Sequence, residues 1–173
     1  PGGIWTAPTD TALKNDIILS MKAGFNGARL HEKVFEDRFH YWADKLGYIT
    51  WAEWGNWGAN ENAKGTETAF MHEWPKIVEH LKNHPSIITW TPFNETNTLE
   101  CNAQHKKLMR LAYDVTKKID PTRPVNETSG YQHQKTDIWT VHHYEPIPDK
   151  LKKALNPKKG VYRNFPKFET SYK

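Results

Sequence analysis

The chain has 173 residues and a mass of 20.2 kDa, with 37% hydrophobic and 25% charged residues. These fractions are close to globular averages, so they exclude a wholly disordered chain, and the length excludes a mini-protein held together by disulfides. The net charge of +4 is mild, and no apolar run approaches the roughly 20 residues that span a bilayer. Eight tryptophans are the unusual feature, because rigid aromatic surface serves both packing and ligand stacking.

The chain carries few signals of processing, redox chemistry or cofactor binding. Its single cysteine, Cys101, excludes an intrachain disulfide. It begins Pro1-Gly2-Gly3, with neither an initiator methionine nor a signal-peptide pattern, so we expect it to be a piece of a longer protein. The sequence has no Gly-rich phosphate loop and no serine nucleophile elbow, and we therefore predict no cofactor.

Apolar residues at helical spacing predict two helices near the beginning of the chain. The first is capped by Thr9 or Asp10 and ended by Gly24, and its inner face consists of Leu13, Ile17, Ile18 and Met21. The second is stopped by Gly47, and its apolar stripe consists of Phe35, Phe39, Trp42 and Leu46.

Three further helices are expected over residues 67–82, 103–118 and 149–155. Pro75 lies inside the first of them, so we expect a kink or a break near Trp74, because proline lacks an amide hydrogen. We assign three of the tryptophans, Trp42, Trp74 and Trp90, to the core.

Five short strands are expected between these helices, at residues 26–31, 48–53, 86–93, 123–127 and 137–143. Strands that alternate with helices predict parallel β/α units, and continuous apolar runs such as Ile87-Ile88-Thr89-Trp90 are typical of strands buried on both faces. The chain is shorter than the roughly 250 residues of a complete (β/α)8 barrel. We therefore expect an α/β fold that is one domain or a piece of one.

Polar side chains gather where these strands end. The five strand ends carry Arg29, His31 and Glu32; Glu53, Trp54, Asn56 and Trp57; Asn94 and Glu95; Asn126 and Glu127; and His142, His143, Tyr144 and Glu145. Ligands of parallel β/α folds bind at this edge of the sheet. Carboxylates and amides that bind hydroxyls, together with aromatic rings, suit a carbohydrate. Neighbouring residues of a strand point to opposite faces, so at most one of His142 and His143 is expected to face the site.

Several segments resemble glycoside hydrolase family 2, which includes β-galactosidases, β-glucuronidases and β-mannosidases. The run NHPSIITWTPFNE (residues 83–95) is similar to the acid/base region of that family. DIILSMKAGFNGARLH (residues 16–31) and FHYWADKLGYITWAEW (residues 39–54) resemble its second and third barrel strands with their helices. DPTRPVNETSGY and TDIWTVHHYE resemble its fifth and sixth strand regions. The resemblance keeps its order over most of the chain and implies a partial (β/α)8 TIM barrel.

The resemblance also implies roles for individual residues. Glu95 corresponds to the general acid/base of a retaining glycosidase, with a pKa raised by burial beside Trp90 or Trp54. Asn94 corresponds to the residue that binds the sugar 2-hydroxyl, and Arg29 to the one that keeps the nucleophile ionised. The remaining pocket positions are His31, Glu53, His142 and Tyr144. We expect Trp54 and Trp57 to stack on sugar.

The sequence also departs from the family pattern. We find no match to the family's nucleophile, a glutamate on the seventh strand, and the context of Glu169 does not fit it. The family's first strand, accessory β-domains and magnesium-binding segment are also unmatched. The chain therefore resembles strands 2 to 6 of that family's catalytic barrel, and we expect residues 1–173 to be a fragment of it. We expect the parent chain, with the rest of the barrel and its accessory β-domains, to be a retaining β-glycosidase and this chain alone to be inactive.

Other readings of the sequence remain open beside this one. His80 and His84 have the spacing of a metal-binding pair, but we find no third ligand and predict no metal. Asn94 and Asn126 each begin a glycosylation acceptor pattern, which we discount because both end buried strands.

The main non-enzymatic alternative is a carbohydrate-binding barrel without catalysis. A weaker alternative is a nucleic-acid interface, which a basic stretch with interleaved aromatic residues would form. This stretch consists of Lys150, Lys152, Lys153, Lys158, Lys159, Tyr162, Arg163 and Phe165. We predict a carbohydrate substrate, and neither a nucleic acid nor a membrane as a partner.

Overall fold

The computed structural model of the chain describes residues 9–96, 101–130, 133–156 and 158–160. Within these residues helices and strands alternate. The helices are α1 (Asp10–Lys22), α2 (Asp37–Leu46), α3 (Lys64–Leu81), α4 (Ala103–Ile119) and α5 (Pro148–Ala154). The strands are β1 (Gly27–Leu30), β2 (Ile49–Glu53), β3 (Ile87–Thr91), β4 (Phe93–Asn94) and β5 (Thr128–Ser129).

The strands are parallel and follow the order of the chain. β1, β2 and β3 form one sheet, in which Arg29 pairs with Trp51 and Glu53 with Thr91. β4 and β5 form a second parallel pair, and a single bridge joins Trp90 of β3 to Val125, which lies shortly before β5. Within the described residues the strands do not close into a barrel. The parallel β/α succession confirms the prediction of a partial (β/α)8 barrel.

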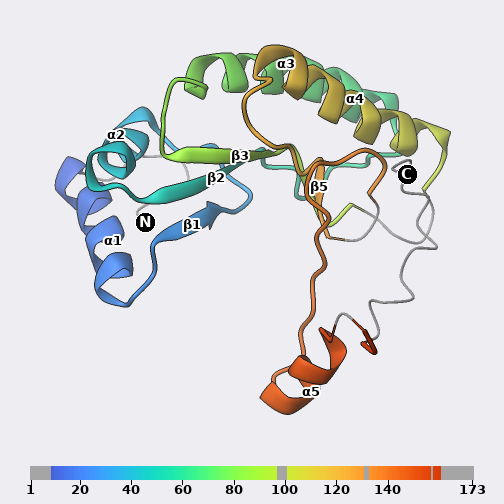
Figure 1. Ribbon diagram of the computed structural model, residues 1–173. Helices are drawn as coiled ribbons and strands as arrows, with labels where there is room; N and C mark the ends of the chain where they lie inside the picture. Colours follow the sequence, from blue (N-terminus) through green and yellow to red (C-terminus); the bar gives the residue numbers. More distant parts are fainter. Residues whose placement is uncertain (1–8, 97–100, 131–132, 157, 161–173) are drawn as a thin grey trace.

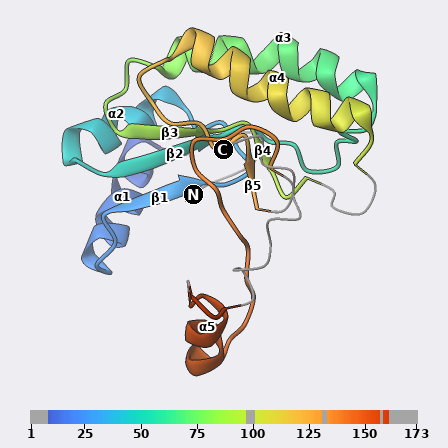
Figure 2. The ribbon, with the colours of Figure 1, turned by 45° about the vertical axis from the view of Figure 1, so that its right-hand side comes forward.

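The helices cover the sheet in two groups (Figure 1). α3 and α4 lie side by side over β3 and β4, and α1 and α2 lie beside β1 and β2; the turned view in Figure 2 shows the same arrangement. The short helix α5 lies apart from the sheet in both views. None of the helices that the structure describes combines the length and the apolar composition needed to cross a membrane.

The main core lies between β2, β3 and β4 and the helix pair α3 and α4. Its largest fully buried side chains are aromatic, and Trp74 meets Trp90 edge to face at 5.9 Å between ring centroids. Each indole N–H has a buried acceptor: Trp74 donates to Thr116 Oγ1 and Trp90 to Asp120 Oδ2, both at 2.8 Å. These bonds remove the cost of burying an unpaired donor.

A smaller core holds α1 and α2 against β1. It consists of Leu13, Ile17, Leu30, Phe39, Ala43 and Tyr48, with Trp42 half-buried at its edge. The start of α1 and the end of α2 carry the expected signals: Thr9 caps α1 through its hydroxyl, and Gly47 ends α2 with φ +68°. Met21, expected on the inner face of α1, is exposed instead, since it belongs to the last turn of that helix.

Pro75 does not break its helix as expected. α3 begins three residues before the predicted start and runs continuously from Lys64 to Leu81. Trp74 and Val78, on either side of the proline, are both fully buried in the main core. Their packing holds the helix on both sides of the hydrogen bond that proline removes.

The segment at residues 137–143 is not a strand, contrary to the sequence prediction. Side chains take up backbone groups of this segment, because Thr140 N–H donates to His133 Nε2 at 3.0 Å and the Ile138 carbonyl accepts from Thr136 Oγ1 at 2.8 Å. The strand expected at 123–127 is likewise displaced: β5 begins at Thr128, and Val125 contributes only a single bridge.

Candidate active site

Glu95 stands immediately after β4, at the carboxyl edge of the sheet. Its φ is +41°, in the left-handed region that a non-glycine residue rarely adopts, and its N–H donates to Ser129 O at 2.9 Å. Asn94, just before it, is 3% exposed. Such strain is characteristic of functional positions that the surrounding structure holds in place.

The Glu95 carboxylate is held by an imidazole and a phenol. Tyr144 Oη donates to Glu95 Oε1 at 2.5 Å, and His142 Nδ1 contacts the same oxygen. The other ring nitrogen of His142 lies 2.9 Å from Ser129 Oγ, which fixes the ring plane. Burial raises the pKa of Glu95, but these two hydrogen bonds favour its charged form and hold the pKa below its ordinary value. The raised pKa expected from the sequence is therefore wrong for the described residues, in which Trp90 and Trp54 do not face this carboxylate.

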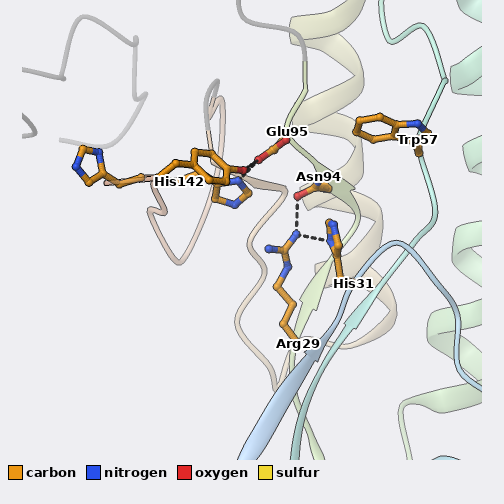
Figure 3. A pocket seen from close by; sticks show the side chains of 8 residues that line it. Arg29, His31, Trp57, Asn94, Glu95 and His142 are labelled. Carbon is orange, nitrogen blue, oxygen red and sulfur yellow. Dashed lines mark hydrogen bonds and ion pairs between the residues drawn. The ribbon is translucent and has the colours of Figure 1, made fainter. Parts of the chain in front are cut away.

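A second network lies below Glu95 (Figure 3). Arg29 donates through Nε to Glu53 and through Nη2 to Asn94 Oδ1, and its Nη2 lies 2.9 Å from His31 Nδ1. The Glu53 side chain is fully buried and also accepts the Glu32 N–H at 3.0 Å. This carboxylate balances the Arg29 charge and fixes the guanidinium next to Asn94.

These two networks meet around one open cavity of about 360 Å³. It is lined by Arg29, His31, Trp57, Asn94, Glu95, His142, His143 and Tyr144. The cavity is small, polar and rich in hydrogen-bonding groups, with one large aromatic ring at the side. In Figure 3, Trp57 and His142 lie on opposite sides of Glu95.

Most of the predicted site residues come together here. Glu95, Asn94, Arg29, His31, His142 and Tyr144 line the cavity, and Glu53 lies behind it as the partner of Arg29. Trp57, 84% exposed, also lines it, as expected of a stacking residue.

Trp54 is placed elsewhere. It is 6% exposed, packs on Phe70 and Phe93 in the main core, and donates its N–H to Glu73 at 2.9 Å. The ring of Trp54 points to the helix side of β2, which excludes the sugar-stacking position expected for it.

Two further expectations about strand ends differ from the structure. Both His142 and His143 line the cavity, because the segment that carries them is irregular and side chains do not alternate as on a strand. Asn126 and Glu127 are fully buried outside the cavity, where Glu127 accepts His133 Nδ1 at 3.0 Å.

The two histidines with metal-binding spacing face different carboxylates. His80 Nε2 lies 2.7 Å from Asp37, and His84 Nδ1 lies 2.6 Å from Asp44. Over residues 9–96, 101–130, 133–156 and 158–160 we find no group of three or more metal-ligating side chains. Glu169 and the tail residues Tyr162, Arg163 and Phe165 lie outside the described residues.

A parallel β/α sheet with an acid, an amide, an arginine and imidazoles on its carboxyl edge has the arrangement in which β/α barrels place their active sites. The model of the glycosyl hydrolases family 2 TIM barrel domain matches residues 8–172, so the chain belongs to that family.

Relatives and solved structures agree with this assignment. The chain is 42% identical over 71 residues to a β-galactosidase of Psychromonas ingrahamii, and this match covers 40% of the chain and 6% of that protein. It is 31% identical over 127 residues to a β-glucuronidase of Bacteroides fragilis, covering 68% of the chain and 18% of that protein. The chain thus spans less than a fifth of these two relatives.

The fold resembles that of an FMN-binding β-glucuronidase from Facaelibacterium prausnitzii L2-6. The TM-score is 0.69 at 23% identity, and the match covers 79% of this chain and 22% of that one. At this identity the likeness concerns the fold alone.

Proposed function

We propose that residues 1–173 form part of the catalytic barrel of a retaining β-glycosidase, in which Glu95 is the general acid/base. The observation that supports this most directly is the Glu95 carboxylate at the end of β4, which lines the polar cavity and is held by His142 and Tyr144. In this class one carboxyl protonates the leaving oxygen, and a second forms a glycosyl-enzyme that water then hydrolyses. The rest of the barrel, including the nucleophile, and accessory β-domains belong to the parent chain.

The lowered pKa of Glu95 fits this role once the second carboxylate is considered. In retaining enzymes the two carboxyl groups lie about 5–5.5 Å apart. A negative charge at that distance raises the pKa of its neighbour, and a bound sugar adds to the effect by excluding water. Two hydrogen bonds that favour the carboxylate also suit the second half of the reaction, in which Glu95 must accept a proton from water.

The neighbours of Glu95 supply sugar recognition. Because Arg29 donates to Asn94 Oδ1, the amide nitrogen of Asn94 is the atom that donates to a sugar hydroxyl. Arg29 adds a positive charge beside the expected position of the nucleophile, which favours its ionised form. Trp57 offers an exposed ring face at the cavity wall for the C–H side of a sugar.

The test is Glu95→Gln in the full-length protein, assayed on phenyl β-galactoside and β-glucuronide. Loss of general acid catalysis predicts a fall in kcat of about 10²- to 10⁴-fold. Glu79→Gln is the matched control, since this carboxylate lies on α3, is 62% exposed, and within the described residues pairs with Lys82. An unchanged rate in Glu95→Gln would contradict the assignment.

A trapping experiment tests the second carboxylate. A 2-deoxy-2-fluoro glycoside with a good leaving group is expected to label a glutamate other than Glu95, which peptide mapping locates. Sugar binding with no turnover and no labelling would instead support the non-catalytic carbohydrate-binding barrel.

A further inference from the structure

The backbone that carries the acid/base lies where two sheets separate. β2 follows β3 as far as Thr91, whose carbonyl accepts the Trp54 N–H at 3.3 Å. Pro92 then has no N–H to donate, and the chain moves on to pair with β5, where Asn94 is opposite Ser129. On the side that faces β2, the backbone of Asn94 therefore lacks a strand partner, and a side chain takes that place.

The replacement is the side chain of Asn56. Asn94 N–H donates to Asn56 Oδ1 at 2.8 Å, and Asn56 Nδ2 donates to Asn94 O at 3.1 Å. The N–H belongs to the peptide before Asn94 and the carbonyl to the peptide that joins it to Glu95. One buried amide thus holds the peptide groups on both sides of Asn94, the second of which directly precedes the strained φ of Glu95, as a neighbouring strand would.

Glu61 determines which way the Asn56 amide faces. The second hydrogen of Asn56 Nδ2 goes to Glu61 Oε1 at 3.1 Å, and the Glu61 side chain is buried, with the residue 6% exposed. With the amide reversed, the oxygen of Asn56 would face two acceptors, the Glu61 carboxylate and the Asn94 carbonyl. The loop is fixed at its beginning as well, since Asn56 N–H donates to Glu32 Oε2 at 2.8 Å.

We propose that Asn56 is a positioning residue for Glu95, holding the Asn94–Glu95 peptide in the geometry that proton transfer to the leaving oxygen requires, and that Glu61 orients the Asn56 amide. The proposal rests on the proposed function, because it takes Glu95 as the general acid/base. General acid catalysis needs hydrogen-bond contact with the leaving oxygen, and a misplacement of about 1 Å costs about 10²-fold in rate.

The experiment compares leaving groups in the full-length protein, using phenyl and 2,4-dinitrophenyl β-glycosides of the sugar it hydrolyses. The dinitrophenolate leaves with little protonation, so misplacement of the acid affects chiefly the phenyl glycoside. Asn56→Ala and Glu61→Ala are expected to lower kcat/KM for the phenyl glycoside about 10- to 100-fold and for the dinitrophenyl glycoside less than about threefold. Glu61→Gln, which keeps an acceptor oxygen for Asn56, is expected to stay close to the unmodified protein on both.

Asn62→Ala is the matched control, because this asparagine lies in the same loop and bonds Asn102 instead of Asn94. Equal losses on both substrates, or no loss, in Asn56→Ala and Glu61→Ala would overturn the proposal. If Asn56→Ala does not fold, Asn56→Ser and the Glu61 pair give the same comparison. Glu95→Gln is measured in parallel. If the loss in Glu95→Gln does not depend on the leaving group, the proposed function itself fails. If the loss depends on the leaving group in Glu95→Gln but not in the Asn56 variants, only the positioning role is refuted.

Discussion

His40, on α2, makes the stability of the smaller core depend on pH. It is fully buried, and neither ring nitrogen has a hydrogen-bond partner among the described residues. The pKa of His40 is lowered from 6.5 to about 4, and burial is the largest cause. The next cause is the charge of His84, whose ring centroid lies 5.1 Å from that of His40. Asp44 and Asp37 act in the opposite direction and His80 in the same one, with smaller effects.

The direction of the effect follows from the protonated states. Between pH 6.5 and 4 the unfolded chain binds a proton at His40 that the folded chain does not bind. Stability contributed by neutral His40 is therefore complete above pH 6.5 and is lost as the pH falls toward 4. At 1.36 kcal/mol for each pH unit, the difference between the two pKa values corresponds to about 3 kcal/mol.

Hydrogen–deuterium exchange of the full-length protein measures this locally. Peptides that cover α2 are followed at pH 6.5 and 4.5, with rates corrected for intrinsic exchange. Protection is expected to fall roughly 40-fold over these two pH units, because His40 of the unfolded chain is already half protonated at pH 6.5 and part of the folded chain is protonated at pH 4.5. In His40→Leu, which cannot titrate, most of this fall is expected to disappear, while contributions from neighbouring carboxylates are common to both proteins. An equal loss of protection in the two would refute the reasoning.

Three further substitutions test the site and the core. Tyr144→Phe removes a hydrogen bond that favours the Glu95 carboxylate, so the pKa of Glu95 should rise and the basic limb of the kcat/KM profile should move to higher pH; an unmoved limb would count against the pairing. Trp57→Ala should raise KM about 3- to 10-fold through lost stacking, and Trp57→Phe should raise it less; equal KM values in the two variants would contradict stacking. Trp90→Phe leaves Asp120 without its buried indole donor, and urea unfolding should show a stability loss of about 1–3 kcal/mol; a loss below 0.5 kcal/mol would contradict it.

The helices and the sheet could be predicted from short-range patterns. In α2, for example, Phe39 belongs to an apolar stripe at helical spacing, and Gly47 adopts the left-handed conformation that ends the helix. The predicted strands at 48–53 and 86–93 correspond to β2 and to β3 with β4. Because parallel strands end at one edge, the gathering of Arg29, Asn94 and Glu95 around one cavity could also be predicted from their positions after strands.

Long-range contacts account for what sequence patterns missed. Trp54 and Trp57 are three residues apart and chemically alike, yet one is buried against Phe70 and the other lines the cavity, which depends on where α3 packs. The loop at 137–143 has the composition of a strand, but hydrogen bonds to the side chains of His133 and Thr136 hold its backbone instead.

The sequence by itself determined the alternation of parallel strands and helices, the family, and the placement of Glu95 at a strand end. Only the tertiary structure decided the direction of the pKa shift of Glu95 and the contacts that support it. The pKa of Glu95 depends on His142 and Tyr144, and its backbone is held by Asn56, all more than 35 residues away along the chain. Spacing along a chain reports which face of an element a residue occupies, whereas a pKa and a strained φ depend on neighbours that only folding brings within a few ångströms.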